Sequence, residues 1–132
     1  MMVKFGYTIV YVNDVNETLS FFEKAFGMKR RFLTDEGDYG ELDTGATTLS
    51  FASHDLGSSN FVGGYVSGSE SEKPLCTEIA LVTNDVNAAH VSALKFGATE
   101  LKTPQQKPWG QVVSYLRSPS GILLELCTPI GS

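Results

Sequence analysis

The chain has 132 residues, of which 42% are hydrophobic and 19% charged, a composition typical of a globular protein and outside the range of disordered chains. At this length a folded chain buries roughly two-thirds of its surface, so its core needs neither disulfides nor metal. Fifteen acidic residues against ten basic ones give a net charge of -5, which repels a phosphate backbone and argues against nucleic acid as a partner.

The cysteines and the start of the chain indicate the cellular compartment. Cys76 and Cys127 lie far apart with no CxxC pairing, which favours reduced thiols over a disulfide framework. The sequence begins MMVKFGYT and has no apolar run of signal-peptide or transmembrane length. We therefore expect one domain, residues 1–132, in a cytoplasmic protein with no membrane partner.

The first predicted unit spans residues 5–53. Residues 7–12 are rich in Val, Ile and Tyr and predict a strand, which ends at an Asn-Asp pair suited to capping a helix. Gly27 stands where a left-handed helix end is expected. The helix between them has apolar positions spaced by three or four residues: Val15, Leu19, Phe22 and Phe26. Three further strands are predicted over about 28–34, 38–44 and 47–53.

The segment 54–75 separates this unit from the next. It is so rich in Gly and Ser that it predicts a linker or a mobile flap. Its apolar exceptions are Phe61, Val62, Tyr65 and Val66. Such side chains either pin a segment to the body of the protein or close over a ligand, and we favour pinning.

The second predicted unit, residues 76–128, repeats the first. The stretch EIALVTNDVN from Glu78 answers YTIVYVNDVN from Tyr7, and a Phe-Gly pair follows in both copies. A strand over 78–83 is therefore followed by a helix with apolar positions at Val86, Val91, Leu94 and Phe96. Strands over about 99–102, 111–117 and 121–128 complete the unit, with a turn at 118–121 before the last. Each unit thus reads βαβββ.

Several pieces of sequence carry a family resemblance: the paired units, the Asn-Asp-Val helix starts, Glu41-Leu-Asp-Thr-Gly45, Trp109-Gly110 and the ending SPSGILLEL. Their order over residues 5–128 resembles the glyoxalase/bleomycin-resistance/extradiol-dioxygenase family, also called the vicinal oxygen chelate superfamily. The resemblance implies an α+β fold in which two tandem βαβββ units form curved mixed sheets around a cup-like cavity. It also implies frequent dimers and, in the enzymes, a divalent metal held by the first and last strand of each unit.

Strand alternation tests whether such a metal centre fits, because residues two apart on a strand share a face. The matching positions carry Tyr7, Ser50, Glu78 and Glu125. Only two of the four are good ligands and none is a histidine, which the zinc, nickel or iron sites of this family usually use. We therefore expect no metal cofactor. The alternative is Mg or Mn held by Glu78 and Glu125 with water completing the coordination.

The two carboxylates still predict binding of an organic ligand. Glu125 lies mid-strand between apolar neighbours, where an unpaired charge is unfavourable, so it should meet a hydroxyl, such as that of Tyr7 or Ser50, or a ligand's cation. Glu78 either joins it or is simply exposed at the wet end of its strand. Each of these acids is a candidate ligand-binding residue.

Aromatic rings near a carboxylate favour flat or cationic ligands. The candidates are Tyr7, Tyr11 and Trp109, with Tyr39 and Tyr115 as further possibilities, although any single ring is more readily explained as core.

Four other side chains are assigned plainer roles. His54 and His90 are expected to be solvated or partly packed, and Cys127 to be a packed thiol. Arg117 is expected to face solvent, with binding of an anionic group as the alternative.

The preferred hypothesis is a metal-free protein, similar to the bleomycin-resistance branch, that sequesters a planar or cationic small molecule in the cup. The rival is a glyoxalase-type lyase or isomerase in which Glu78 and Glu125 hold a metal that polarises vicinal oxygens, with Glu125 as the one catalytic candidate. A regulatory domain with a vestigial cup is a third possibility. We expect a homodimer.

Overall fold

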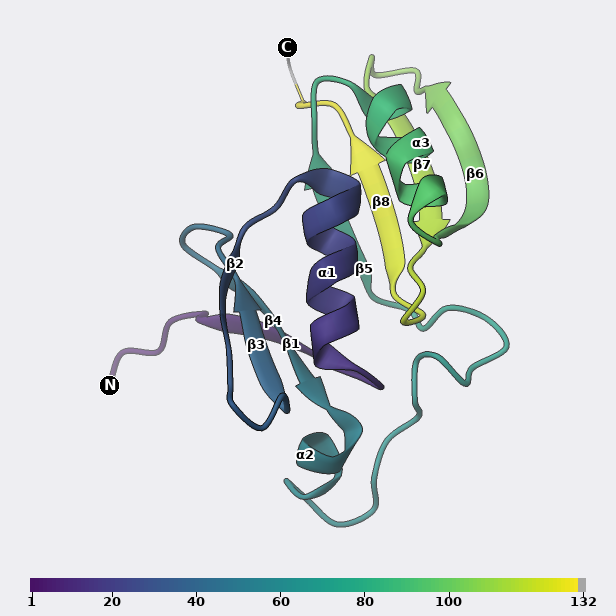
Figure 1. The fold of residues 1–132 in the computed structure, drawn as a ribbon. Coiled ribbons are helices and arrows are strands. Elements are labelled where there is room, and N and C mark those ends of the chain that lie inside the picture. Colours follow the sequence, from purple (N-terminus) through teal and green to yellow (C-terminus); the bar gives the residue numbers. More distant parts are fainter. Residues whose placement is uncertain (131–132) are drawn as a thin grey trace. The chain divides into compact units, whose positions relative to one another are not determined.

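The computed structural model describes residues 1–130; residues 131 and 132, the end of the predicted domain, lie outside the described residues. The chain divides into two compact units, Met1–Ser67 and Gly68–Ser132. The division falls within the segment 54–75 that was predicted as a linker. Each unit contains a four-stranded mixed sheet with one long helix packed on one of its faces (Figure 1).

The first unit contains β1 (Tyr7–Val12), α1 (Val15–Phe26), β2 (Arg30–Leu33), β3 (Tyr39–Leu42), β4 (Thr48–Ser53) and the short helix α2 (His54–Ser58). The strand order is β1-β4-β3-β2, with β1 parallel to β4 and the other pairs antiparallel. The Asp14 carboxylate caps α1 by accepting the Glu17 N–H at 2.9 Å. Gly27 ends α1 in the left-handed region, at φ 67°. Both predicted helix ends are confirmed.

The second unit contains β5 (Glu78–Val82), α3 (Val86–Lys95), β6 (Thr99–Gln106), β7 (Val112–Arg117) and β8 (Leu123–Cys127). Its strand order, β5-β8-β7-β6, repeats that of the first sheet. Asp85 caps α3 as Asp14 caps α1, with the Ala88 N–H 3.0 Å from its carboxylate. The predicted α+β fold of two βαβββ units is confirmed.

Strand β6 is longer than predicted. It continues beyond residue 102 to Gln106 and passes through Pro104, with irregular pairing to β7. Proline is tolerated there because β6 is the edge strand, where a missing backbone N–H leaves no neighbour unpaired.

The two long helices differ in how well their buried face could be predicted. In α1 the predicted residue Phe22 is buried and stacks on Phe51 of β4 with ring centroids 5.3 Å apart. In α3 the prediction is confirmed for Val86, which is 2% exposed, and wrong for the other positions, since Val91 is 65%, Leu94 38% and Phe96 37% exposed. The buried residues are Val86, His90 and Ala93. Steps of four and three residues place these three on one side of a helix that turns about 100° per residue.

The start of the predicted linker is folded rather than loose. Its first five residues form α2, and further along the ring of Tyr65 packs on Tyr11 of β1, with centroids 4.7 Å apart. The two ring nitrogens of His54 lie 2.6 Å from the Tyr65 hydroxyl and 3.2 Å from that of Ser67. Tyr65 therefore pins this stretch to the first unit, which is the role that we favoured. The other three apolar residues do not share it, because Phe61, Val62 and Val66 are exposed.

None of the helices within residues 1–130 combines the length and the apolar character needed to cross a membrane. Both cysteines are free thiols, with Cys76 exposed and Cys127 buried.

Candidate functional site

The candidate site lies on the second sheet, on the face opposite α3. The register places Ala80, Glu125 and Tyr115 side by side across β5, β8 and β7, and the next row contains Glu78, Leu123 and Arg117. Ser114, one residue before Tyr115, points the other way and contacts His90 of α3. We call the face away from α3 the acid face; it carries Glu78, Tyr115, Arg117, Glu125 and Cys127.

Glu125 accepts a hydrogen bond from a hydroxyl, but from neither of the two named in the sequence analysis, those of Tyr7 and Ser50. The Tyr115 hydroxyl donates to Oε1 of Glu125 at 2.9 Å. Tyr115 is directly opposite Glu125 on the neighbouring antiparallel strand, a cross-strand partner that repeat matching could not identify. This bond, with burial and the negative charge of Glu125, raises the pKa of Tyr115 to about 12, because an ionised phenol would repel the carboxylate.

Glu78 is exposed, yet it lies next to Glu125 on the acid face. It is the first residue of β5, and Ala80, two residues on, is opposite Glu125. Partial desolvation raises the pKa of the Glu78 carboxyl, and the negative charge of Glu125 raises it further. No Lys, Arg or His of the described chain, residues 1–130, forms an ion pair with either acid. The two carboxylates therefore form an acid pair without a neutralising side chain.

Cys127 lies one row beyond Glu125 on the same face and is buried. Burial raises the pKa of its thiol, and the neighbouring Glu125 raises it further. A protonated thiol is a poor nucleophile, which supports the packed role expected for Cys127.

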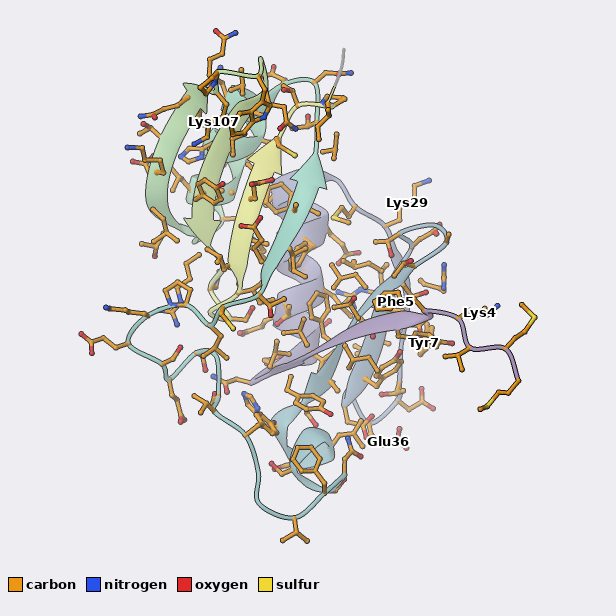
Figure 2. The ribbon with its side chains drawn as sticks, turned by 180° about the vertical axis from the view of Figure 1, so that it is seen from behind. Lys4, Phe5, Tyr7, Lys29, Glu36 and Lys107 are labelled. Atoms are coloured by element: carbon orange, nitrogen blue, oxygen red, sulfur yellow. The ribbon has the colours of Figure 1, made fainter. Side chains whose placement is uncertain are left out.

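The first unit carries the other two predicted positions, Tyr7 and Ser50, on the face of its sheet opposite α1. Tyr7 is 59% exposed at the start of β1, where Figure 2 also shows Phe5. Ser50 is fully buried on β4, with its hydroxyl 3.5 Å from the Thr8 carbonyl. The register pairs Tyr7 with Thr48 and Ser50 with Ile9, so both side chains share this face.

Sequence analysis missed a carboxylate on that face. Glu41 of β3 is buried opposite Ser50 and accepts a hydrogen bond from the Tyr39 hydroxyl at 2.7 Å. Arg31 of β2 lies 3.3 Å from the same carboxylate and 3.3 Å from Asp43. Burial and the Glu41 carboxylate raise the pKa of Tyr39. The signal was present in the sequence, since Tyr39 and Glu41 stand two apart in a predicted strand.

The two remaining aromatic candidates lie at separate places. Tyr11 packs on Tyr65, and its hydroxyl accepts a hydrogen bond from Asn60 at 3.2 Å. Trp109 is 67% exposed in the β6–β7 connection and donates to Gln111 at 2.7 Å; Figure 2 labels Lys107 in the same connection. That connection adjoins the Cys127 end of the sheet, whereas Glu78 lies at the Leu123 end, about 13 Å away along the strands.

His90 is buried rather than solvated. Its ring nitrogens lie 2.9 Å from the Ser114 hydroxyl and 2.7 Å from the Glu100 carboxylate, the order of groups found in hydrolase triads. Ser114 is fully buried against α3, so no substrate can reach its hydroxyl. The three side chains therefore fix α3 to the sheet.

Comparison with known proteins identifies the family. The model of the Glyoxalase/Bleomycin resistance protein/Dioxygenase superfamily matches residues 4–126. The chain belongs to this superfamily. No curated protein matches the sequence.

Solved structures of this superfamily have the same fold. A glyoxalase-related enzyme from Fulvimarina pelagi is 17% identical with a TM-score of 0.81, covering 99% of this chain and 94% of that one. A glyoxalase/bleomycin resistance protein/dioxygenase family enzyme from Burkholderia phytofirmans PsJN is 15% identical with a TM-score of 0.76, covering 96% and 98%. A superfamily member from Sphaerobacter thermophilus is 20% identical with a TM-score of 0.70, covering 98% and 99%. At these identities the likeness shows the fold.

The donor chemistry does not fit the histidine-containing metal centre of glyoxalase-superfamily enzymes. In the first unit the matching positions hold neutral hydroxyls, those of Tyr7 and Ser50, and in the second they hold the acid pair. Among residues 1–130, no group of three or more His, Cys, Asp or Glu side chains could hold a metal ion. Zinc or iron prefers nitrogen or sulfur ligands that this set lacks.

Proposed function

We propose that this superfamily member binds a small organic cation, planar or aromatic, through Glu78 and Glu125, and that it sequesters this molecule without a resident metal. One observation carries the proposal: two neighbouring carboxylates share a sheet face on which no side chain of the described residues neutralises them. Two like charges in partial desolvation raise the pKa of Glu78, and a bound cation would relieve that repulsion.

Tyr115 supports an aromatic ligand over a simple ammonium ion. Its hydroxyl donates to Oε1 of Glu125, which leaves the other carboxylate oxygen for the ligand. Its ring lies on the same face, and a planar cation near a ring face gains about 0.5–1 kcal/mol at exposed sites. The homodimer and the cytoplasmic location expected from the sequence stay predictions.

A dye titration tests the proposal. Protein treated with EDTA is titrated with ethidium, a planar organic cation, and with bromophenol blue, an anionic dye, and binding is followed by fluorescence and absorbance. We expect ethidium to bind in the micromolar range and the anionic dye to bind at least about tenfold more weakly. Equal binding of both dyes would overturn the proposal.

Two matched variants assign the binding to the acid pair. Glu125→Gln removes one charge of the pair and should weaken ethidium binding about tenfold. Glu100→Gln removes the same charge from the same unit, but on the α3 side at His90, and should leave the affinity unchanged. Equal effects of the two substitutions would show only a general attraction to an acidic protein.

A metal-dependent lyase or isomerase is the second candidate, since the closeness of Glu78 and Glu125 suits the hard oxygen donors that Mg or Mn prefers. Metal analysis of the purified protein separates it from the first. Stoichiometric Mg or Mn that is lost, together with a lyase activity, in Glu125→Gln would replace the sequestration proposal.

A further inference from the structure

Arg117 lies where a cation could neutralise the acid pair. It is the last residue of β7 and shares the acid face with Tyr115, two residues earlier. It stands in the same row as Glu78, with Leu123 between them. Adjacent strands are about 4.8 Å apart, so the Cα atoms of Arg117 and Glu78 are about 10 Å apart, within the combined reach of the two side chains.

The guanidinium is instead bound to neutral groups of residues 68–72, which we call the strap. Its Nη2 donates to the Gly68 carbonyl at 2.7 Å and to the Ser71 carbonyl at 3.0 Å, and its Nη1 to the Glu72 carbonyl at 3.3 Å. Its Nε donates to the Gly121 carbonyl at 3.3 Å. The expectation that Arg117 faces solvent is therefore wrong, because its donors are used by backbone carbonyls.

Gly121 allows the strap to approach the sheet closely, independently of Arg117. It has a φ of 90°, and a Cβ added there would lie 2.6 Å from the Gly68 carbonyl oxygen. Inside the strap, the Ser71 hydroxyl donates to the same carbonyl at 2.8 Å. The strap can thus pack directly on Gly121, which has no side chain, and it is held there by hydrogen bonds from the Arg117 guanidinium.

We propose that Arg117 determines the charge specificity of the acid pair through the strap. Because the strap holds the guanidinium on backbone carbonyls, its positive charge stays away from Glu78 and Glu125, and the pair remains open to a cationic ligand. Release of the strap frees a competing cation. This inference rests on the proposed function, because it names what keeps that site selective for cations.

Two substitutions of Arg117 separate the effect of its positive charge from the effect of its hydrogen bonds to the strap. Neither Lys nor Gln has the fork of five N–H donors that the carbonyls require, so both should release the strap. Only Lys retains a positive charge that can reach Glu78. We expect Arg117→Lys to bind ethidium about five- to tenfold more weakly than Arg117→Gln. Equal ethidium affinity in the two variants would overturn the proposal.

The strap itself is tested by cleavage with Glu-C protease after Glu70 and Glu72. Both Arg117 variants should be cut there at least about fivefold faster than the wild type, whereas unchanged rates would show that Arg117 does not hold the strap. Arg30, whose guanidinium contacts Asn16, Ser20 and Glu23 in the first unit, supplies the control. Arg30→Lys and Arg30→Gln should change neither this cleavage nor ethidium binding.

A variant that displaces the strap but keeps Arg117 tests the proposal without any change at position 117. Gly121→Ala adds a methyl group where the strap packs, so it should displace the strap, free the Arg117 guanidinium and lower the affinity for ethidium. Adding Arg117→Gln removes that positive charge and should restore the affinity. Failure of that restoration would contradict the proposal.

One readout needs no ligand. The titration of Tyr115, followed by its ultraviolet absorbance, should shift to lower pH in Arg117→Lys but not in Arg117→Gln, because a nearby ammonium group favours the phenolate. If the wild type bound no ethidium, the proposed function would fail while this titration and the cleavage would still test the strap. Identical Tyr115 titrations in Arg117→Lys and Arg117→Gln would contradict the proposal that the strap keeps a positive charge away from the acid pair.

Discussion

The two units have the same strand order, and each carries acidic and tyrosine side chains on the sheet face away from its long helix, yet their charges are balanced differently. In the first unit Glu41 is buried and is neutralised by Arg31, with the Tyr39 hydroxyl as a further donor. In the second unit Glu125 has the Tyr115 hydroxyl but no cation, and Glu78 adds a second negative charge. The repeated topology therefore supplies the position of a carboxylate, while one neighbouring residue decides whether that carboxylate is structural or available to a ligand.

Removal of Arg31 should give the largest effect on stability. Arg31→Gln would leave the buried Glu41 carboxylate with only the Tyr39 hydroxyl, and since Arg31 is partly exposed we expect a loss of about 1–3 kcal/mol. Urea denaturation measures it. A loss below about 0.5 kcal/mol would mean that Arg31 does not hold Glu41, and the two units would then not differ in how their carboxylates are neutralised.

Tyr39 and Tyr115 should respond differently to loss of the neighbouring carboxylate. Glu125→Gln should lower the pKa of Tyr115 from about 12 towards the ordinary tyrosine value of 10.0, because the hydrogen bond to Glu125 is the main cause of the shift. Glu41→Gln should lower the pKa of Tyr39 by less, because burial is the main cause there. Ultraviolet titration of each variant against the wild type checks both. A Tyr115 titration that does not move would refute the hydrogen bond to Glu125.

Loss of a charge from the acid pair should stabilise the second unit slightly. In the folded state the pKa of Glu78 is raised above the ordinary glutamate value of 4.5. The contribution of Glu78 to the free energy of unfolding is therefore fully present below pH 4.5 and is lost as the pH rises through the raised pKa. Glu78→Gln removes that fall, and for a partly exposed group we expect a gain of at most about 1 kcal/mol at pH 7. Urea denaturation at pH 7 and at pH 4 should show the gain only at the higher pH. A loss of stability at pH 7 would contradict the repulsion.

The smallest effect concerns the thiols. Cys76 is exposed and should react with Ellman's reagent at pH 8 before the buried Cys127 does. Glu125→Gln should speed the slow phase by about twofold to threefold, because a neighbouring charge that raises the pKa of Cys127 is removed. A single fast phase for both thiols would show that Cys127 is accessible.

The sequence was sufficient to predict the fold and the sheet face on which Glu78 and Glu125 lie. Two copies of Asn-Asp-Val-Asn marked both helix starts, and alternation in the last strand placed Glu125 on the face away from the helix. The hydrogen-bond partner of Glu125 was missed because the register between two strands is a tertiary property. The sequence alone does not show that Tyr115 of β7 lies opposite Glu125 of β8. On the buried face of α3, Val86 was predicted but His90 was missed, because histidine is polar and its burial depends on contacts with Ser114 of β7 and Glu100 of β6.

Arg117 shows the same limit most clearly. Every residue has a backbone carbonyl, so hydrogen bonds from a guanidinium to carbonyls leave no recognisable pattern in the amino-acid sequence. The sequence could therefore predict only that Arg117 faces solvent or binds an anionic group. Arg31 and Glu41 form the opposite case, because each stands on a predicted strand and only their pairing was unknown.

In this account the acid pair, and not the neutralised Glu41, binds an organic cation. The most direct test is calorimetric titration of ethidium into the wild type, into the double variant Glu78→Gln/Glu125→Gln and into Glu41→Gln. We predict that the double variant loses at least about tenfold in affinity and that Glu41→Gln, provided it is folded, binds like the wild type. Unchanged ethidium affinity in the double variant would contradict the account.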